Sequence, residues 1–278
     1  MRDFKPKKYL GQNFMTDPIA LDMVMKSADL KPDDIVLEVG PGTGLLTKQL
    51  VDKVKKVIAI EKDRELVERL ANEFKSKKNL EVIASDILKF DFEKYFQPSS
   101  HPKIGGASGG MKQSYKVVAN IPYYLTSHLI QKFLYASHKP SVIILTIQKE
   151  VGERVVAKAG QMSLLSVSVQ LVADAVLDGF ISRKSFFPSP QVDSVIIKII
   201  PKNKHPEVTD TKLFFQIVKA CFIGKRKQIH NTLKHNLKLS GKQVDDILDK
   251  CKISPQVRPQ ELSMEDWISL YKSIRDTN

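Results

Sequence analysis

The chain has 278 residues, of which 42% are hydrophobic and 27% are charged, and its formal net charge is +13. This length and composition predict a soluble globular protein with one sizeable α/β core and a smaller second unit. The longest apolar runs have only the length of a core strand, which excludes a membrane-spanning helix, and the excess of Lys and Arg favours a polyanionic partner.

The first eight residues are basic, but no apolar stretch follows them, so they lack the pattern of a secretory signal. We therefore expect a cytoplasmic protein. The two cysteines, Cys221 and Cys251, are too far apart for a Cys-x-x-Cys motif and too few for a disulfide framework. The six histidines have no ligand spacing with the cysteines or with one another, so we expect no metal site.

From residue 31 to residue 201, short runs rich in β-branched residues alternate with helical patterns, which predicts an α/β fold with a mostly parallel sheet. The last two runs are joined by a proline-containing segment without a helical pattern, so we expect an antiparallel last strand. A polar stretch with four glycines, 97–114, predicts a surface loop. The seven predicted strands are 35–39, 57–60, 80–84, 116–119, 141–147, 175–181 and 192–200.

After Pro201 the composition changes to a short polar linker followed by helical periodicity alone. We therefore predict a sheet domain of residues 1–200, with an N-terminal segment of residues 1–30, and a small all-helical domain of residues 201–278. Ser263 with Asp266 three residues later resembles a capping box at the start of the last helix. The predicted helices of the second domain are 211–222, 225–237, 242–251 and 263–274.

A glycine-rich turn, Gly40-Pro41-Gly42-Thr43-Gly44, follows the first predicted strand. Glycines in such a turn let the backbone bend sharply and approach a ligand closely. The spacing differs from the Gly-x-Gly-x-x-Gly of dinucleotide-binding folds, and no P-loop lysine follows it. Tight packing of a strand against a helix is the alternative explanation.

Two acidic residues, Glu61 and Asp86, end the next two predicted strands. The carboxyl ends of parallel strands share one crevice, where open α/β sheets bind their ligands. Glu61 can accept hydrogen bonds from vicinal ribose hydroxyls, and Asp86, with the apolar Ile87 beside it, can accept one from an adenine amine. Taken singly, each acidic residue is also explained as a turn residue or a helix cap.

The segment Asn120-Ile121-Pro122-Tyr123 follows the fourth predicted strand at the same edge of the sheet. The Asn120 side-chain oxygen and the Ile121 carbonyl can each accept a hydrogen from an adenine N6 amine, which concentrates electron density on a poor nucleophile. Tyr123 can stack on one face of a flipped base, and Phe186, which precedes the last strand, on the other. This pattern favours an amino-group methyltransferase, although an Asn-Pro-type turn with packing aromatic rings is the alternative.

Several of these segments, in this order and spacing, resemble the KsgA-type rRNA adenine dimethyltransferases. The resemblance implies a Rossmann-like methyltransferase sheet and S-adenosylmethionine as the methyl donor. It also implies dimethylation of N6 of two adjacent adenosines in the 3′-terminal hairpin of small-subunit rRNA, late in the assembly of an immature subunit. The matching segments are 9–14 (YLGQNF), 38–47 (EVGPGTGLLT), Glu61, Asp86, 120–123 (NIPY), 148–151 (QKEV) and 186–194 (FFPSPQVDS).

The resemblance also implies roles for particular residues. The N-terminal segment contacts cofactor or RNA, with Asn13 and Met15 at the methionine portion of the cofactor, although Leu is usual in the family at the second of these positions. The helical domain binds rRNA, and we expect a monomer. The expected cofactor contacts are Asn13, Met15, Gly40, Gly42, Glu61, Asp86, Ile87 and Asn120, and the expected phosphate contacts are Lys225, Arg226, Lys227 and Lys234.

Four alternatives remain at this point. The Erm group resembles the same core but methylates large-subunit rRNA. A second possibility is an assembly factor that binds rRNA and acts mainly without catalysis. DNA adenine methyltransferases share an Asn-Pro-Pro-Tyr-like motif, but here the second position is Ile and no base-recognition domain follows. For the basic cluster after Pro201, a solvated charged face is the alternative to phosphate binding.

Overall fold

The structure is a computed structural model that describes residues 6–96, 114–224 and 226–276. The chain forms two compact units: unit 1 comprises Met1–Gly152 and Ala175–Pro201, and unit 2 comprises Glu153–Asp174 and Lys202–Asn278. The second unit therefore differs from the expected 201–278 because it also includes the segment Glu153–Asp174.

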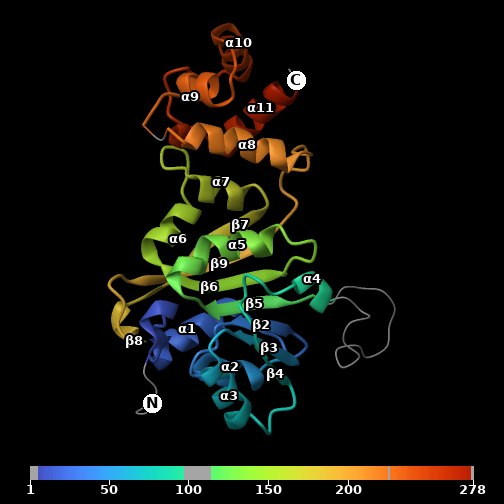
Figure 1. Cartoon of the computed structure of the whole chain (residues 1–278), viewed down its shortest axis with the longest axis vertical. Helices are drawn as coiled ribbons and strands as arrows, with labels where there is room; N and C mark the ends of the chain where they lie inside the picture. The colour runs from blue at the N-terminus through green and yellow to red at the C-terminus, as the bar shows by residue number, and fades with distance from the viewer. Residues whose placement is uncertain (1–5, 97–113, 225, 277–278) are drawn as a thin grey trace. The chain divides into compact units, whose positions relative to one another are not determined.

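A seven-stranded mixed sheet forms the centre of unit 1 (Figure 1). Its strands are β2 (Ile35–Val39), β3 (Lys56–Glu61), β4 (Leu80–Ala84), β5 (Lys116–Asn120), β6 (Val142–Gln148), β7 (Ala173–Ile181) and β9 (Ser194–Pro201). They lie in the order β4-β3-β2-β5-β6-β9-β7. The first five are parallel, and β9 runs antiparallel to β6. The predicted α/β fold with seven strands and an antiparallel last strand is confirmed.

The strand order changes direction between β2 and β5. From β2 the chain moves outward through β3 to β4, and it then returns to the other side of β2 to form β5 and β6. The open crevice beyond the carboxyl ends of the strands at such a switch point is the usual ligand site of an α/β sheet. The motifs after β2, β3, β4 and β5 all reach this edge.

Helices that precede or connect the parallel strands cover the sheet of unit 1. Val24, Leu50 and Leu70, from three of these helices, share an apolar core with Val36 and Ile144 of the sheet. The helices and 3-10 turns are η1 (Lys8–Leu10), α1 (Pro18–Ala28), α2 (Leu45–Val51), α3 (Arg64–Glu73), α4 (Phe92–Tyr95), η2 (Tyr123–Leu125), α5 (Thr126–Leu134) and η3 (Arg183–Ser185). The helix α6 (Lys149–Val155) follows β6.

A two-stranded ladder holds the N-terminal segment of unit 1 in place. The strand β1 (Phe14–Met15) pairs antiparallel with β8 (Phe186–Phe187), with Met15 opposite Phe186. Directly after this ladder, the N–H of Thr16 donates to the carbonyl of Ser185 at 2.9 Å. The helix α1 then begins with Asp17 as its N-cap and proline at its first position, as expected from their preferred conformations.

Unit 2 has its own apolar core, in which Trp267, Phe214 and Leu233 are fully buried. Ser263 and Asp266 form the predicted capping box at the start of the last helix. In the described part of the chain, no helix has the length and apolar character needed to cross a membrane. The helices are α7 (Leu164–Gln170), α8 (Thr211–Phe222), α9 (Ile229–Asn236), α10 (Gly241–Cys251), η4 (Pro259–Glu261) and α11 (Met264–Arg275).

Candidate functional site

One pocket in unit 1 lies at the carboxyl edge of the sheet, where the strand order reverses. Its walls come from the N-terminal segment and from the residues that follow β2, β3, β4 and β5. All eight residues predicted to contact the cofactor line it: Asn13, Met15, Gly40, Gly42, Glu61, Asp86, Ile87 and Asn120.

The glycine turn after β2 forms the floor of this pocket. Gly40 has a φ of +65°, and a Cβ built on it would meet no atom within 4 Å. Gly42 has a φ of +59°, and a Cβ there would lie 2.7 Å from the ring of Phe14. Gly40 therefore keeps space open for a ligand, whereas Gly42 allows the N-terminal segment to pack on the turn.

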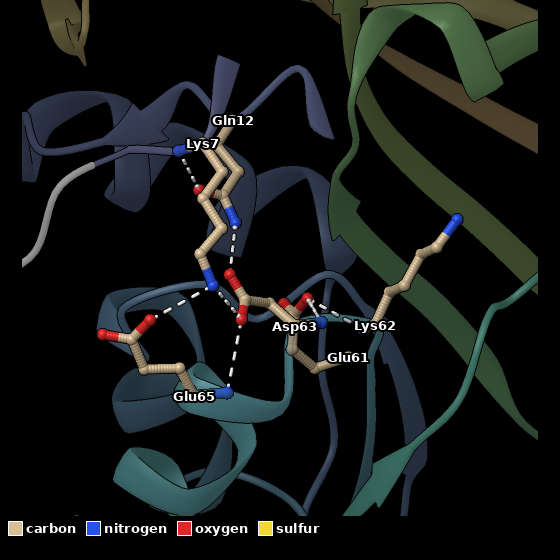
Figure 2. Close-up of polar contacts among 6 residues, drawn as sticks. All are labelled: Lys7, Gln12, Glu61, Lys62, Asp63 and Glu65. Carbon is tan, nitrogen blue, oxygen red and sulfur yellow. Dashed lines mark hydrogen bonds and ion pairs between the residues drawn. The ribbon is translucent and has the colours of Figure 1, made fainter. Parts of the chain in front are cut away.

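Glu61, at the end of β3, is 7% exposed and joins two loops at the pocket. Its Oε2 accepts a hydrogen bond from the N–H of Gly42 at 3.2 Å. Its Oε1 accepts from the N–H groups of Lys62 and Asp63 at 2.8 and 2.9 Å (Figure 2). Burial raises the pKa of Glu61, and these three N–H groups act in the opposite direction. The carboxylate is thus held in one orientation. Its Oε1 already accepts two hydrogen bonds and its Oε2 accepts one, so Oε2 retains a lone pair for a ligand.

Asp86, just after β4, lines the pocket next to the end of β3, the strand that carries Glu61. Its Oδ2 lies 3.0 Å from the Nζ of Lys62, and its Oδ1 accepts from the N–H of Leu88 at 3.0 Å. Burial acts to raise the pKa of Asp86, but the hydrogen bonds from Lys62 and Leu88 outweigh it and lower the pKa. Asp86 is therefore ionised at neutral pH and can accept from a ligand amine.

Asn120 ends β5 and has a fixed side-chain orientation. Its Nδ2 donates to the backbone carbonyl of Asn13 at 3.0 Å. Because a carbonyl can only accept, the atom beside it must be the amide nitrogen. The Oδ1 of Asn120 is then left as the acceptor of this amide.

Tyr123 and Phe186, the two predicted base-stacking residues, do not line the pocket. The hydroxyl of Tyr123 lies 2.8 Å from that of Ser194, which ties η2 to the start of β9, and burial raises the pKa of Tyr123. Phe186 is only 4% exposed and belongs to the apolar core, whereas its neighbour Phe187 is 57% exposed. Phe186 therefore differs from the prediction of an accessible ring, because adjacent residues of a strand face opposite ways and β8 turns Phe186 inward.

Glu38, in β2 just before the glycine turn, was part of the glycine motif but had no predicted role of its own. It lines the pocket and is 1% exposed. Within the described residues, its Oε2 has no hydrogen-bond partner. Burial raises the pKa of Glu38 to about 8, the neighbouring Thr47 hydroxyl acts against this, and the charge of Glu61 reinforces it. Glu38 is therefore protonated at neutral pH in the free protein.

This shift predicts a pH-dependent stability difference between the parent and Glu38→Gln. An unfolded glutamate loses its proton near pH 4.5 and the folded one near pH 8. Between these pH values the folded parent keeps a proton that its unfolded state has lost, so its free energy of unfolding falls as the pH rises. The free energy of unfolding of the variant should rise relative to the parent by up to about 1.4 kcal/mol per pH unit. Urea unfolding at pH 5 and pH 8 measures it, and a parallel pH dependence of the two proteins would contradict the assignment.

Unit 2 carries a second, basic hollow. Among the described residues, three cationic side chains line it, those of Arg226, Lys227 and Arg258, of which the first two were predicted phosphate contacts. Lys234 is exposed on α9 but does not line the hollow, and Lys225 lies outside the described residues. The helix α9 begins at Ile229, after the basic cluster, because its N-cap Gln228 has an extended backbone conformation.

Lys62, Gln12 and Tyr124 are among the pocket-lining residues that were absent from the predictions. Lys62 directly follows Glu61, but nothing in the sequence shows that its side chain reaches Asp86. Gln12 lies in a motif that was noted only as a resemblance. Tyr124 is 56% exposed and lies 3.2 Å from the Cβ position of Gly11, a contact between segments far apart in the chain.

Comparisons with known proteins agree with this site. The family model described as ribosomal RNA adenine dimethylase matches residues 3–276. Two curated relatives are named ribosomal RNA small subunit methyltransferase A. The one from Dehalococcoides mccartyi is 38% identical over 267 residues, with 96% of this chain and 87% of that protein covered. The one from Clostridium acetobutylicum is 36% identical over 275 residues, with 98% and 95% covered.

Solved structures show the same fold. The dimethyladenosine transferase from Plasmodium falciparum superposes with a TM-score of 0.77 at 28% identity, with 95% of this chain and 98% of that chain covered. The 23S rRNA methyltransferase ErmE superposes with a TM-score of 0.70 at 24% identity, with 94% and 99% covered, and is similar in fold. The chain belongs to the ribosomal RNA adenine dimethylase family.

Proposed function

We propose that this protein uses S-adenosylmethionine to dimethylate N6 of two adjacent adenosines in the 3′-terminal hairpin of small-subunit rRNA, within an immature subunit. The observation that carries the proposal is the placement of Asn120, whose amide oxygen is left as an acceptor, at a pocket where Glu61 and Asp86 suit an adenosine. Membership of the ribosomal RNA adenine dimethylase family supports it.

The pocket residues fit the methyl donor. Glu61 would hold the ribose hydroxyls and Asp86 the adenine amine, with Ile87 against the adenine ring. The open space over Gly40 suits the methionine portion. So does the Oε2 of Glu38, which has no partner among the described residues and would face the ammonium group. When bound, the donor supplies a sulfonium methyl group for in-line displacement, a reaction that depends mainly on positioning.

Asn120 would act on the target amine. Its Oδ1 accepts one N6 hydrogen, and the Ile121 carbonyl is proposed to accept the other, which draws electron density onto the nitrogen that attacks. The hydrogen bond from Asn120 to Asn13 keeps the acceptor oxygen, rather than the NH₂ group, available for this contact. After the first transfer one N6 hydrogen remains, so one of the two acceptors suffices for the second transfer.

The aromatic residues would form the base site around this amine. Tyr123 is held by Ser194 next to Pro122, which lines the pocket, and we propose that it forms one wall of the base site. Phe186 is buried and pairs with Met15, so we propose that it packs against the N-terminal segment when no base is bound. To stack on the base, the Phe186 ring would have to move out of the core.

We propose that unit 2 binds rRNA through the basic hollow. The charge-reversed variant Arg226→Glu/Lys227→Glu should bind small-subunit rRNA about 10- to 100-fold more weakly, since each cation contributes a phosphate contact. Its affinity for S-adenosylhomocysteine should stay unchanged, because these residues are remote in sequence from the pocket and do not line it. Filter binding at several salt concentrations and calorimetry measure the two affinities.

The matched control is Lys53→Glu/Lys55→Glu, which changes the net charge equally. Both lysines are exposed in the turn before β3, at the edge of the sheet away from the pocket. Equal losses of rRNA affinity in the two variants would show that only total charge matters and would overturn the assignment to this hollow.

Substrate preference tests the proposed function directly. The purified protein should methylate immature small subunits lacking this modification, but not large subunits or adenine-containing duplex DNA. Methylation of large subunits instead would favour the Erm-like alternative, and DNA methylation would reject an RNA substrate. We also propose that the protein acts in the cytoplasm and as a monomer.

A further inference from the structure

Residues 7–15, here called the strap, run along the pocket and supply six of its lining residues, Leu10 to Met15. The end of the strap nearer α1 is held by the β1–β8 ladder. The other end is held by a cluster of polar side chains around Asp63, which lies between β3 and α3 (Figure 2). None of these contacts was expected from the sequence.

Both carboxylate oxygens of Asp63 contact side chains of the strap. Its Oδ1 lies 2.7 Å from the Nζ of Lys7, and its Oδ2 accepts from the Nε2 of Gln12 at 3.1 Å. The Oε1 of Gln12 in turn accepts from the N–H of Lys7 at 2.7 Å. The Lys7 ammonium also lies 3.1 Å from Glu65. Lys7 and Gln12 of the strap are therefore bonded to each other, and the strap is also bound to the start of α3.

Burial makes this contact more than an ordinary surface ion pair. The Asp63 side chain is 3% exposed and that of Lys7 is 29% exposed. Burial alone would raise the pKa of Asp63, but the hydrogen bonds from Lys7 and Gln12 outweigh it and lower the pKa. If the strap lifted away, Asp63 would lose both its ion pair with Lys7 and its hydrogen bond from Gln12. Asp63 thus favours the closed strap.

Hydrogen bonds connect the cluster and the strap to Glu61, which would hold the cofactor, and to Asn120, which would hold the target amine. The N–H of Asp63 donates to Glu61, the proposed ribose acceptor, at 2.9 Å. Farther along the strap, the carbonyl of Asn13 accepts from Asn120 at 3.0 Å. Figure 2 shows the side chain of Lys62 turned away from this cluster, so it takes no part in it. A shift of the strap would therefore disturb the orientation of both Glu61 and Asn120.

We infer that Lys7, Gln12 and Asp63 are positioning residues that latch the strap over the bound cofactor and so control how long each cofactor molecule stays bound. The inference rests on the proposed function for the identity of the cofactor. Dimethylation consumes one cofactor molecule for each methyl group, so the latch must release the product and close again on a new donor.

The test measures S-adenosylhomocysteine binding to the full chain. Lys7→Met and Gln12→Leu should each weaken binding about tenfold, mainly through faster dissociation, since each removes a hydrogen bond to a buried charge. The KM for S-adenosylmethionine should rise by a similar factor. At saturation the bound cofactor keeps the strap in place beside Asn120, so kcat should change less than about threefold. Lys7→Arg, which keeps the cation, should restore most of the affinity.

The matched control is Lys31→Met, which removes an exposed lysine paired with Asp29 at 2.8 Å and does not line the pocket. Binding by Lys7→Met as tight as that of this control would overturn the inference. So would a loss of kcat without a change in KM, or a loss in Lys7→Arg equal to that in Lys7→Met. The binding assay does not depend on catalysis. If the variants lost S-adenosylhomocysteine affinity as expected but the parent methylated no rRNA, only the proposed function would be overturned.

Discussion

Replacing Asn120 with alanine should slow methyl transfer by about 10²- to 10³-fold, the usual cost of removing one polar contact made to the reacting group. The reason is the geometry at the end of β5: the amide nitrogen is bound to Asn13, and the remaining oxygen is the proposed acceptor of the N6 hydrogen. The single-turnover rate with small subunits and saturating S-adenosylmethionine measures the effect. Cofactor affinity should fall less than the rate does.

Asn72→Ala is the matched control for this variant, because Asn72 is an exposed residue of α3 that does not line the pocket. It should methylate at the parental rate. If Asn120→Ala were as fast as this control, Asn120 would not be the acceptor, and the assignment of the chemistry to the segment after β5 would fail.

The second large effect is expected for Glu61→Gln, which should weaken S-adenosylhomocysteine binding by about 10- to 100-fold, because hydrogen bonds to a charged acceptor are the strong ones. The substitution keeps the shape of the side chain but replaces a carboxylate oxygen with a donor. That donor would face the N–H groups of Gly42 or of Lys62 and Asp63. Titration calorimetry measures the affinity.

A cofactor analogue without ribose hydroxyls separates a binding role of Glu61 from a purely structural one. The parent should lose affinity for this analogue, whereas Glu61→Gln should lose little more, because the contact is already gone. Glu73→Gln, at the exposed end of α3, should bind like the parent. Equal sensitivity of the parent and Glu61→Gln to the missing hydroxyls would show that Glu61 does not hold the ribose.

The sheet and the pocket floor could be predicted because their signals are local. Each strand is a short apolar run bounded by turn residues, and the carboxyl ends of parallel strands necessarily meet at one edge. That rule alone predicts that four residues lie close together, namely Gly40, Glu61, Asp86 and Asn120. In the structure all four line one pocket. The capping box at Ser263 was equally local.

The contacts that the sequence did not reveal join segments far apart in the chain. The strands β1 and β8 have two residues each, too few for a periodic pattern, and no rule connects Lys7 with Asp63. The two neighbouring phenylalanines of β8 gave no indication of which one faces the core. Likewise, no change in composition separates the segment Glu153–Asp174 from the sheet domain, although its apolar residues pack with the C-terminal helices.

The most direct test of the proposed function is mass spectrometry of small-subunit rRNA from cells that lack this protein, with and without restored expression. We expect two adjacent adenosines in the 3′-terminal hairpin to be unmodified in its absence, and to carry two methyl groups each when the parent chain is restored but not when Asn120→Ala is. Dimethylation of both adenosines in cells without the protein, or its restoration by Asn120→Ala, would contradict the account.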